Sequence, residues 1–455
     1  MSRPSILNSV ERKFILLIGD LLIVLVSLNV LVNHAIDEEF ISVKFKIIVF
    51  ATGLFIYLSL AYILDFYNLE KALKRKYIFS QSIYISALYV LVIFLFTVLV
   101  FDVSFWRIPL LCFLMLTPVE ISLWRFFFGN VFKILPITKN VLYIYDDSTE
   151  ESLRKDTEII DGQDIETFHK VKITYSINKS NLNNKKTFLS AANKIDTWII
   201  NTNNYNNFPK ELEKILLRSI LQGKEVVSFT SYYENIYEAL PIRSHNDSFY
   251  EILQLRNKKI RYLHRIFNFS VNFSLCFFVG VLLVLCIPFV FILNLLFNKG
   301  PLFYTQKRVG QYGKEFKIFK FRSMVVDAEK SGAKMATKND SRITPFGKIL
   351  RAFRVDELPQ IISVIKGDMQ FIGPRPERKI FVDELNKITP FYNVRHLIKP
   401  GITGWAQVKY KYGENLDDSV KKLEFDLYYI KNKSITLDLR IMFKTITTVL
   451  FSRGI

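Results

Sequence analysis

The chain has 455 residues, half of them hydrophobic, and its 61 Lys and Arg outnumber its 42 Asp and Glu, for a formal net charge of +19. This length is sufficient for two or three domains, and the positive charge predicts anionic partners. Long apolar segments favour lipid headgroups and nucleotide phosphates over nucleic acid as those partners. The cysteines lie in apolar stretches and form no CxxC pair, which argues against a disulfide framework or a cysteine metal cluster: Cys112, Cys276 and Cys286.

Four apolar segments open the chain, at roughly residues 14–32, 43–64, 78–101 and 105–128. Each approaches the ~20 residues that cross a ~30 Å hydrocarbon core, which predicts a four-helix transmembrane region over residues 1–132. The first loop is acidic, whereas the N-terminus, the second loop and the stretch after the fourth segment are basic. The positive-inside rule therefore places the N-terminus and the bulk of the chain in the cytoplasm.

Residues 140–248 form a soluble, Asn-rich section in which short apolar runs at 141–145, 197–200 and 225–229 alternate with a helical pattern at 211–221. This alternation predicts a small cytosolic α/β module with a parallel sheet. The first strand ends in Asp146-Asp147-Ser148 rather than in GxGxxG. We therefore interpret the module as Rossmann-like but degenerate, with a structural or regulatory role.

A fifth apolar segment, residues 266–297, has basic residues on both sides and is interrupted by Pro288. Basic flanks at both ends conflict with a simple crossing, and a proline bends or breaks a helix. A re-entrant helix over about residues 260–297, broken at Pro288, accounts for both features. The alternative is a kinked spanning helix, which places everything after Gly300 outside the cell.

An acidic pair, Asp356-Glu357, lies at a predicted helix start within RAFRVDELPQIISVIKGDMQFIGPRPER, residues 351–378. Pro359 falls in the first turn and Gly367 is a natural stop. Carboxylates at a helix N-terminus among arginines suggest a nucleophile or a magnesium ligand in phosphoryl chemistry. The alternative is a solvated helix cap, which is our interpretation of the similar Asp383-Glu384 pair.

Two glycines, Gly310 and Gly313, predict a turn between two strands. The second strand then places one mixed aromatic and basic set on a single face: Phe316, Ile318, Lys320 and Arg322. Such a face can hold a diphosphate or lie against lipid headgroups. A solvated edge strand remains the alternative.

Several ordered motifs carry a family resemblance: Gly300-Pro301, QKRVG at 306–310, KFRSM at 320–324, DELPQ at 356–360, GPRPE at 373–377 and KPGITGWAQV at 399–408. From about Lys259 to Gly454 the chain resembles the polyprenyl-phosphate sugar-1-phosphate transferases of the monotopic bacterial type. The whole chain resembles the large members that initiate exopolysaccharide, capsule or O-antigen assembly. It departs from the family where Ile287 replaces the usual Ser before Pro288 and where Asn268 stands at a common Asp position.

The resemblance implies an α-helical membrane bundle, the α/β module and an α+β monotopic catalytic domain over residues 256–455, in the bacterial inner membrane with the catalytic domain on the cytoplasmic face. It implies that Asp356 attacks a UDP-sugar, releases UMP, and passes the phosphosugar to undecaprenyl phosphate. Mg²⁺ is the implied cofactor, with Glu357 and Asp356 as ligands, and a homodimer is the implied assembly. The predicted phosphate contacts are Arg351, Arg375, Arg322 and Lys320. The alternatives are a non-catalytic scaffold of polysaccharide assembly and a glycosyltransferase that releases UDP.

Overall fold

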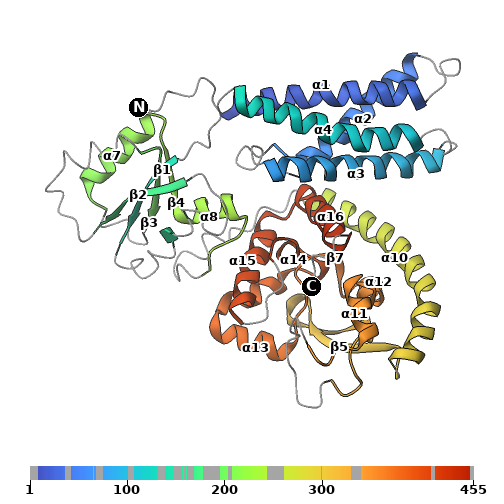
Figure 1. Ribbon diagram of the computed structural model, residues 1–455. Coiled ribbons are helices and arrows are strands. Elements are labelled where there is room, and N and C mark those ends of the chain that lie inside the picture. The colour runs from blue at the N-terminus through green and yellow to red at the C-terminus, as the bar shows by residue number, and fades with distance from the viewer. Residues whose placement is uncertain are drawn as a thin grey trace. The chain divides into compact units, whose positions relative to one another are not determined.

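The computed structural model describes residues 9–35, 43–64, 66–67, 75–100, 107–131, 139–146, 156–157, 160, 169–177, 195–202, 208–242, 261–298, 300–328, 340–410 and 416–450. The chain divides into two compact units, Met1–Val141 with Lys155–Lys172 and Leu142–Arg154 with Ile173–Ile455 (Figure 1). The loops that carry most of the charges used to predict the membrane topology lie outside the described residues. That topology stays a prediction.

The first unit is built from long helices: α1 (Ser9–Ala35), α2 (Val43–Ile63), α3 (Arg75–Val100) and α4 (Arg107–Val131). Each predicted apolar segment is therefore helical, and α1 packs on α2 and α4, while α3 packs on α2 and α4. Tyr77–Phe94 in α3 and Ile108–Gly129 in α4 are long and apolar enough to cross a membrane. The apolar stretches of α1 and α2 are shorter, Phe14–Val30 and Phe50–Ile63.

A buried ion pair joins α1 to α4 inside this helical unit. The Nε of Arg125 donates to Asp20 Oδ1 at 3.3 Å, its Nη1 donates to the Phe66 carbonyl at 2.9 Å, and both charged side chains are fully buried. Charged groups in an apolar bundle are stable only when they are paired. The pair therefore specifies how α1 and α4 face one another.

The α/β module contains β1 (Lys139–Tyr145), β2 (His169–Ser176), β3 (Thr197–Asn201), β4 (Glu225–Ser228), α7 (Lys210–Leu221) and α8 (Phe229–Tyr237). The sheet order is β2-β1-β3-β4, and β3 and β4 run parallel. The predicted strands and helix are confirmed, whereas β2 and α8 were missed. Asp147 and Ser148, used against a dinucleotide site, lie outside the described residues.

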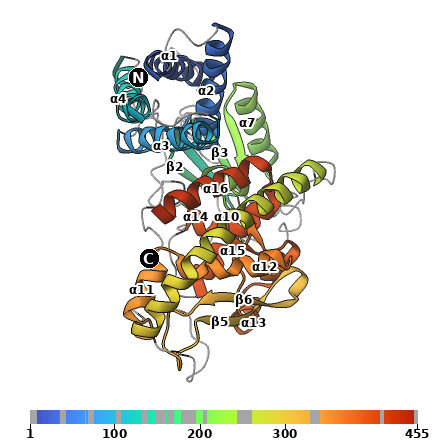
Figure 2. The ribbon, with the colours of Figure 1, turned by 90° about the vertical axis from the view of Figure 1, so that its right-hand side faces the viewer.

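The long apolar helix α10 (Arg261–Phe297) continues without interruption through Pro288. It follows a curved path along one side of the domain that comes after it (Figures 1 and 2). Near its start the His264 imidazole lies 2.8 Å from Asp438, and just beyond its end Asn298 Nδ2 donates to the Arg322 carbonyl at 2.8 Å. Both ends of α10 are therefore attached to the same domain.

Along its length α10 has two different faces. Leu283 and Val290 pack into a buried cluster with Phe321, Leu350 and Ile361. The opposite face leaves large apolar side chains exposed: Phe269, Phe273, Phe277, Phe278, Val284, Leu285 and Phe289. An apolar face of this extent is typical of contact with lipid. The basic residues Arg256, Lys258, Lys259 and Lys299, which flank α10, lie outside the described residues.

The domain after α10 begins with an antiparallel hairpin, β5 (Phe303–Val309) and β6 (Glu315–Phe321), which pairs Phe303 with Phe321. The 3₁₀ turn η6 (Gln311–Gly313) joins the strands, and Gly313 has a positive φ of 76°, as the predicted glycine turn requires. The remaining elements are α11 (Pro345–Ala352), η7 (Val355–Gln360), α12 (Ile361–Ile365), β7 (Gln370–Ile372), α13 (Lys379–Ile388), η8 (Pro390–Leu397), β8 (Gly401–Thr403), α14 (Trp405–Lys409), α15 (Leu416–Asn432) and α16 (Ile435–Leu450).

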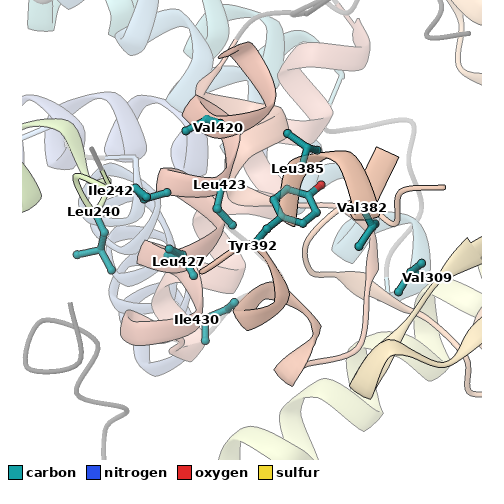
Figure 3. Close-up of a cluster of buried hydrophobic side chains, with 10 residues drawn as sticks. All are labelled: Leu240, Ile242, Val309, Val382, Leu385, Tyr392, Val420, Leu423, Leu427 and Ile430. Atoms are coloured by element: carbon teal, nitrogen blue, oxygen red, sulfur yellow. The ribbon is translucent and has the colours of Figure 1, made fainter. Parts of the chain in front are cut away.

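The core of this domain also takes in residues from the end of the α/β module. Figure 3 shows Leu240 and Ile242 on one side of the cluster, with Leu423 and Tyr392 between them and Val382. The other members are Val309, Leu385, Val420, Leu427 and Ile430. The segment that follows α8 is therefore part of the same hydrophobic core as α13 and α15.

Glu238 fixes that segment by polar contacts. It ends α8 with a positive φ of 53°, and its carbonyl accepts a hydrogen bond from Trp405 Nε1 at 2.9 Å. Its carboxylate contacts Lys409 and Arg440, which hold the pKa of Glu238 at about 2 despite burial. A non-glycine residue in the left-handed region persists only when its surroundings hold it there.

We expect Leu240→Ala to lower the free energy of unfolding of the domain by about 2–5 kcal/mol, because it leaves a cavity at a side chain that is 1% exposed. Leu221→Ala is the matched control, since Leu221 is 86% exposed and its loss should change stability by less than about 0.5 kcal/mol. Denaturant unfolding followed by tryptophan fluorescence measures both. Equal effects of the two variants would contradict the packing described here.

Candidate active site

The acidic pair is carried by a short 3₁₀ helix between two α-helices. α11 begins with a Thr344 cap whose Oγ1 accepts from the Gly347 amide at 3.0 Å, and it is followed by Arg354 with a positive φ of 56°. The chain then enters η7, which holds Asp356 and Glu357 in its first turn, as predicted, although the helix is 3₁₀ rather than α. Gly367, at φ 82°, terminates the following α12.

Glu357 is surrounded by cationic side chains from separate elements. Its Oε1 lies 3.1 Å from Lys320 Nζ of β6 and 2.6 Å from Arg375 Nη2, and its Oε2 lies 3.7 Å from Arg354 Nη1. Although burial opposes ionisation, these cations, Arg375 and Lys320 above all, hold the pKa of Glu357 well below its ordinary value. Glu357 is therefore ionised at neutral pH.

Asp356 lies beside it in a different electrostatic environment. The residue is 6% exposed, and its Oδ1 is buried without a hydrogen-bond partner among the described residues. Burial, followed by the neighbouring Glu357 charge, raises the pKa of Asp356 to about 6, although Lys320 and Arg351 act in the opposite direction. Adjacent carboxyls with pKa values pushed apart are a common arrangement in acid–base and nucleophilic catalysis.

Lys320 reaches Glu357 because β6 turns this residue toward η7, against which the strand packs. Burial lowers the pKa of the Lys320 ammonium, and the Glu357 charge opposes that shift. Arg351, at the last turn of α11, donates from its Nε to Ser323 Oγ at 2.9 Å. Its positive charge acts on Asp356, so the structure brings Arg351, Lys320 and Arg375 to the acidic pair.

Arg322 is placed differently from the prediction of a phosphate contact. Its guanidinium contacts the Asn298 carbonyl and, at 3.5 Å, Asn294 Oδ1, both at the end of α10. It also lies against Gly300, where an added Cβ would be 1.9 Å from Arg322 Nη1. The side chain therefore closes the C-terminal end of α10 instead of facing the carboxylates. The alternation of side chains along a strand predicted that Arg322 and Lys320 share one face. Because β6 ends at Phe321, this alternation does not extend to Arg322.

The sequence did not assign a role to Arg354, whereas the structure directs its side chain to Glu357. It also missed Ser323, which holds Arg351. Ser323 lies in KFRSM, two residues beyond the last residue of β6, where its hydroxyl reaches the Arg351 side chain. His396 is buried next to Arg395, and both effects lower its pKa to about 4, so it is neutral at physiological pH.

The described residues contain no cluster of three or more His, Cys, Asp or Glu side chains that could hold a metal ion. A metal ion at this site would therefore have the two carboxylates of the acidic pair as its protein ligands. Mg²⁺ needs one or two carboxylates, with waters and substrate phosphates as its other ligands. The unpartnered Asp356 Oδ1 and the remaining lone pairs of Glu357 satisfy this need. The arrangement as a whole combines a poised carboxylate with guanidinium and ammonium groups, which suits chemistry on a phosphate.

Comparison with known proteins identifies what this region is similar to. The sequence model described as bacterial sugar transferase matches residues 261–452. UDP-N-acetylgalactosamine-undecaprenyl-phosphate N-acetylgalactosaminephosphotransferase of Aeromonas hydrophila is 50% identical over 157 residues, 34% of this chain and 37% of that protein. UDP-glucose:undecaprenyl-phosphate glucose-1-phosphate transferase of Xanthomonas campestris pv. campestris is 47% identical over 156 residues, 34% of this chain and 32% of that protein.

A shorter relative is matched over most of its length. Exopolysaccharide production protein PSS of Rhizobium leguminosarum bv. phaseoli is 40% identical over 188 residues, 38% of this chain and 91% of that protein. The match to the Aeromonas and Xanthomonas proteins, by contrast, spans about a third of their length. The residues matched by the family model, 261–452, include Asp356 and Glu357.

The two carboxylates should affect stability in opposite directions. Because the Asp356 pKa is raised to about 6, its ionisation costs stability at pH 7.5, and that cost shrinks as the pH falls through 6 toward about 4. We expect Asp356→Asn to raise the unfolding midpoint at pH 7.5, through a gain on the order of 1–3 kcal/mol in the free energy of unfolding, and to approach wild type at low pH.

Glu357→Gln should lower the midpoint at pH 7.5, because it leaves Lys320 and Arg375 without their counter-charge. Since the Glu357 pKa is depressed, its stabilisation is present at neutral pH and is lost as the pH falls. Thermal unfolding of the detergent-solubilised protein across this pH range measures both variants. Shifts of the same sign at pH 7.5 would contradict the assignment of distinct charge states.

Proposed function

The chain belongs to the bacterial sugar transferase family, and from this we propose that it transfers a sugar-1-phosphate from a UDP-sugar to undecaprenyl phosphate and releases UMP. The observation that carries the proposal is the buried Asp356, with an unpartnered oxygen and a pKa of about 6, beside a Glu357 held anionic by cations. Relatives named for undecaprenyl-phosphate sugar phosphotransfer share this domain.

In the proposed reaction a carboxylate oxygen of Asp356 attacks the β-phosphorus of the donor. The bond from that phosphorus to the bridging oxygen breaks, and UMP leaves with the electron pair. An oxygen of undecaprenyl phosphate then attacks the same phosphorus, and the bond to Asp356 breaks. One diphosphate linkage is lost and one is made, so no further energy source is needed.

Arg375, Arg351 and Lys320 support this chemistry because they place positive charge around the carboxylates and leave Asp356 Oδ1 without a hydrogen bond among the described residues. A guanidinium matches the geometry of phosphate oxygens. Arg322 is left out of the phosphate contacts, since its side chain is engaged at the end of α10. Glu357 and Asp356 are the residues that would hold Mg²⁺, and a bound Mg²⁺ would neutralise charge on the donor diphosphate.

We also propose that α10 lies with both ends on the cytoplasmic face of the bacterial inner membrane. Its 37 residues extend to roughly 55 Å, well beyond a ~30 Å hydrocarbon core. The attachment of both ends to one domain, through His264 and Asn298, supports a re-entrant path over a crossing. Pro288 then contributes to the curve of the helix and not to a break.

The broader role we propose is the first membrane step of exopolysaccharide, capsule or O-antigen synthesis, carried out by a homodimer anchored through α1–α4. The names of the relatives support the acceptor lipid and a sugar donor. A non-catalytic scaffold of polysaccharide assembly is the rival reading.

Nucleotide release tests the reaction. Purified protein supplied with Mg²⁺, undecaprenyl phosphate and a panel of UDP-sugars should release UMP from one donor. Asp356→Asn should reduce this turnover by at least about 1,000-fold, because the nucleophile is removed. Asp383→Asn is the matched control, since Asp383 is an exposed residue of α13 in a similar acidic pair, and it should retain activity.

Release of UDP instead of UMP would mean that sugar alone is transferred, and it would overturn the mechanism. Full activity of Asp356→Asn in cells would favour the scaffold.

The rate should also depend on pH through Asp356. Because its carboxylate is the nucleophile and its pKa is about 6, the rate should fall as the pH drops through 6. Lys320 stabilises that carboxylate, so Lys320→Met should raise the pKa of Asp356. The acid limb of the pH–rate profile, where the rate falls with falling pH, should then move upward by roughly one pH unit. Lys317→Met, an exposed lysine of the same strand, should leave the limb in place. An unmoved limb in Lys320→Met would refute this role.

A further inference from the structure

The loop that carries Arg375 is held from outside itself. The carbonyls of residues 374–377 accept four hydrogen bonds in succession: Pro374 from the Gly401 amide at 2.9 Å, Arg375 from Arg395 Nη2 at 2.8 Å, Pro376 from Arg308 Nη1 at 3.2 Å and Glu377 from the Val309 amide at 2.9 Å. Pro374 and Pro376 have no N–H, so the loop cannot use amide donors of its own at these positions. Its shape is set by donors from β8, η8 and β5.

Arg395 is the buried member of this set. Its side chain is 7% exposed, and its guanidinium lies 2.8 Å from Asp426 of α15 and contacts the Tyr392 hydroxyl as well as the Arg375 carbonyl. A buried ion pair adds little net stability, since desolvation offsets the attraction. What a planar guanidinium offers is several donors in a rigid arrangement, each directed at a different acceptor.

Arg308 plays a similar part at the next carbonyl. Its Nη1 contacts both the Pro376 carbonyl and the Glu377 carboxylate, the latter at 3.1 Å. Neither Arg308 nor Arg395 contacts Asp356 or Glu357 directly among the described residues. Arg395 bonds the carbonyl of Arg375 itself, and Arg308 bonds the carbonyl of the next residue, Pro376. The guanidinium of the same Arg375 reaches Glu357 at 2.6 Å.

We propose that Arg395, oriented by Asp426, is a positioning residue that acts through Arg375: it fixes the Arg375 carbonyl and thereby holds the Arg375 guanidinium on Glu357. The inference rests on the proposed function for its catalytic consequence, but the structural link stands by itself. Loss of Arg395 frees the loop, and Arg375 no longer stays on Glu357. The effect on catalysis therefore runs entirely through Arg375.

A double-mutant cycle tests this route. Arg395→Gln should lower kcat/KM for UMP release by about 10–100-fold, as expected when support of a site residue is lost. Combined with Arg375→Gln, it should cost no more than about threefold beyond Arg375→Gln alone, because the two residues act in series. Losses that multiply in the double variant would overturn the inference.

Asp426→Asn provides a second variant in case Arg395→Gln fails to fold, since it keeps the arginine but loosens its orientation. It should give a smaller loss with the same dependence on Arg375. Arg440→Gln is the control for breaking an Arg–carboxylate pair in the same domain, because Arg440 pairs with Glu238 at 2.7 Å. It should lower the unfolding midpoint and leave the kcat/KM of the folded protein within about threefold.

Hydrogen exchange supplies a readout that does not need activity. In Arg395→Gln, the Val309 and Gly401 amides should exchange at least about tenfold faster, because they donate to the same loop, whereas Arg440→Gln should leave them unchanged. Unchanged exchange of these two amides in Arg395→Gln would refute the positioning role of Arg395, whether or not the wild type makes UMP. If the wild type is inactive but these amides exchange faster in Arg395→Gln, the proposed function is rejected and the positioning role of Arg395 is retained.

Discussion

The charge of Glu357 is the constraint on which the active-site region depends. A buried carboxylate needs counter-charge, and here Lys320 comes from the β5–β6 hairpin, Arg375 from the loop after β7 and Arg354 from the end of α11. One anion thus joins elements that are distant in the sequence. Burial is the larger cause of the raised pKa of Asp356, and the charge of the same anion raises it further.

The apolar helix α10 is integrated with this arrangement instead of being a simple anchor. Its inward side chains pack with Leu350 and Ile361, on the helices that flank Asp356. Polar contacts at its two ends, through His264 and Asn298, attach it to α16 and β6. A helix that is apolar on its outer face and attached at both ends therefore packs directly against the elements that carry the acidic pair.

The end of the α/β module has a similar double role. Leu240 and Ile242 belong to the same hydrophobic core as α15. The Glu238 carbonyl accepts a hydrogen bond from Trp405, and its carboxylate pairs with Lys409 and Arg440. Trp405 directly follows Gly404, whose backbone lies against Gly373 at the start of the Arg375 loop. A continuous path of buried contacts therefore connects α8 with the loop that supplies Arg375 to Glu357.

The sequence by itself determined the features that depend on short-range physics. Apolar runs specified α1–α4 and α10, positive-φ glycines specified the hairpin turn and the end of α12, and the proline and acidic residues specified the start of η7. Only the tertiary structure decided which arginine serves which partner: Arg354 and Arg375 meet Glu357, Arg322 closes α10, and Arg395 holds a backbone carbonyl. The reason is physical, because a long flexible guanidinium takes its partner from whatever acceptor the folded chain brings within reach, and local periodicity contains no record of that choice.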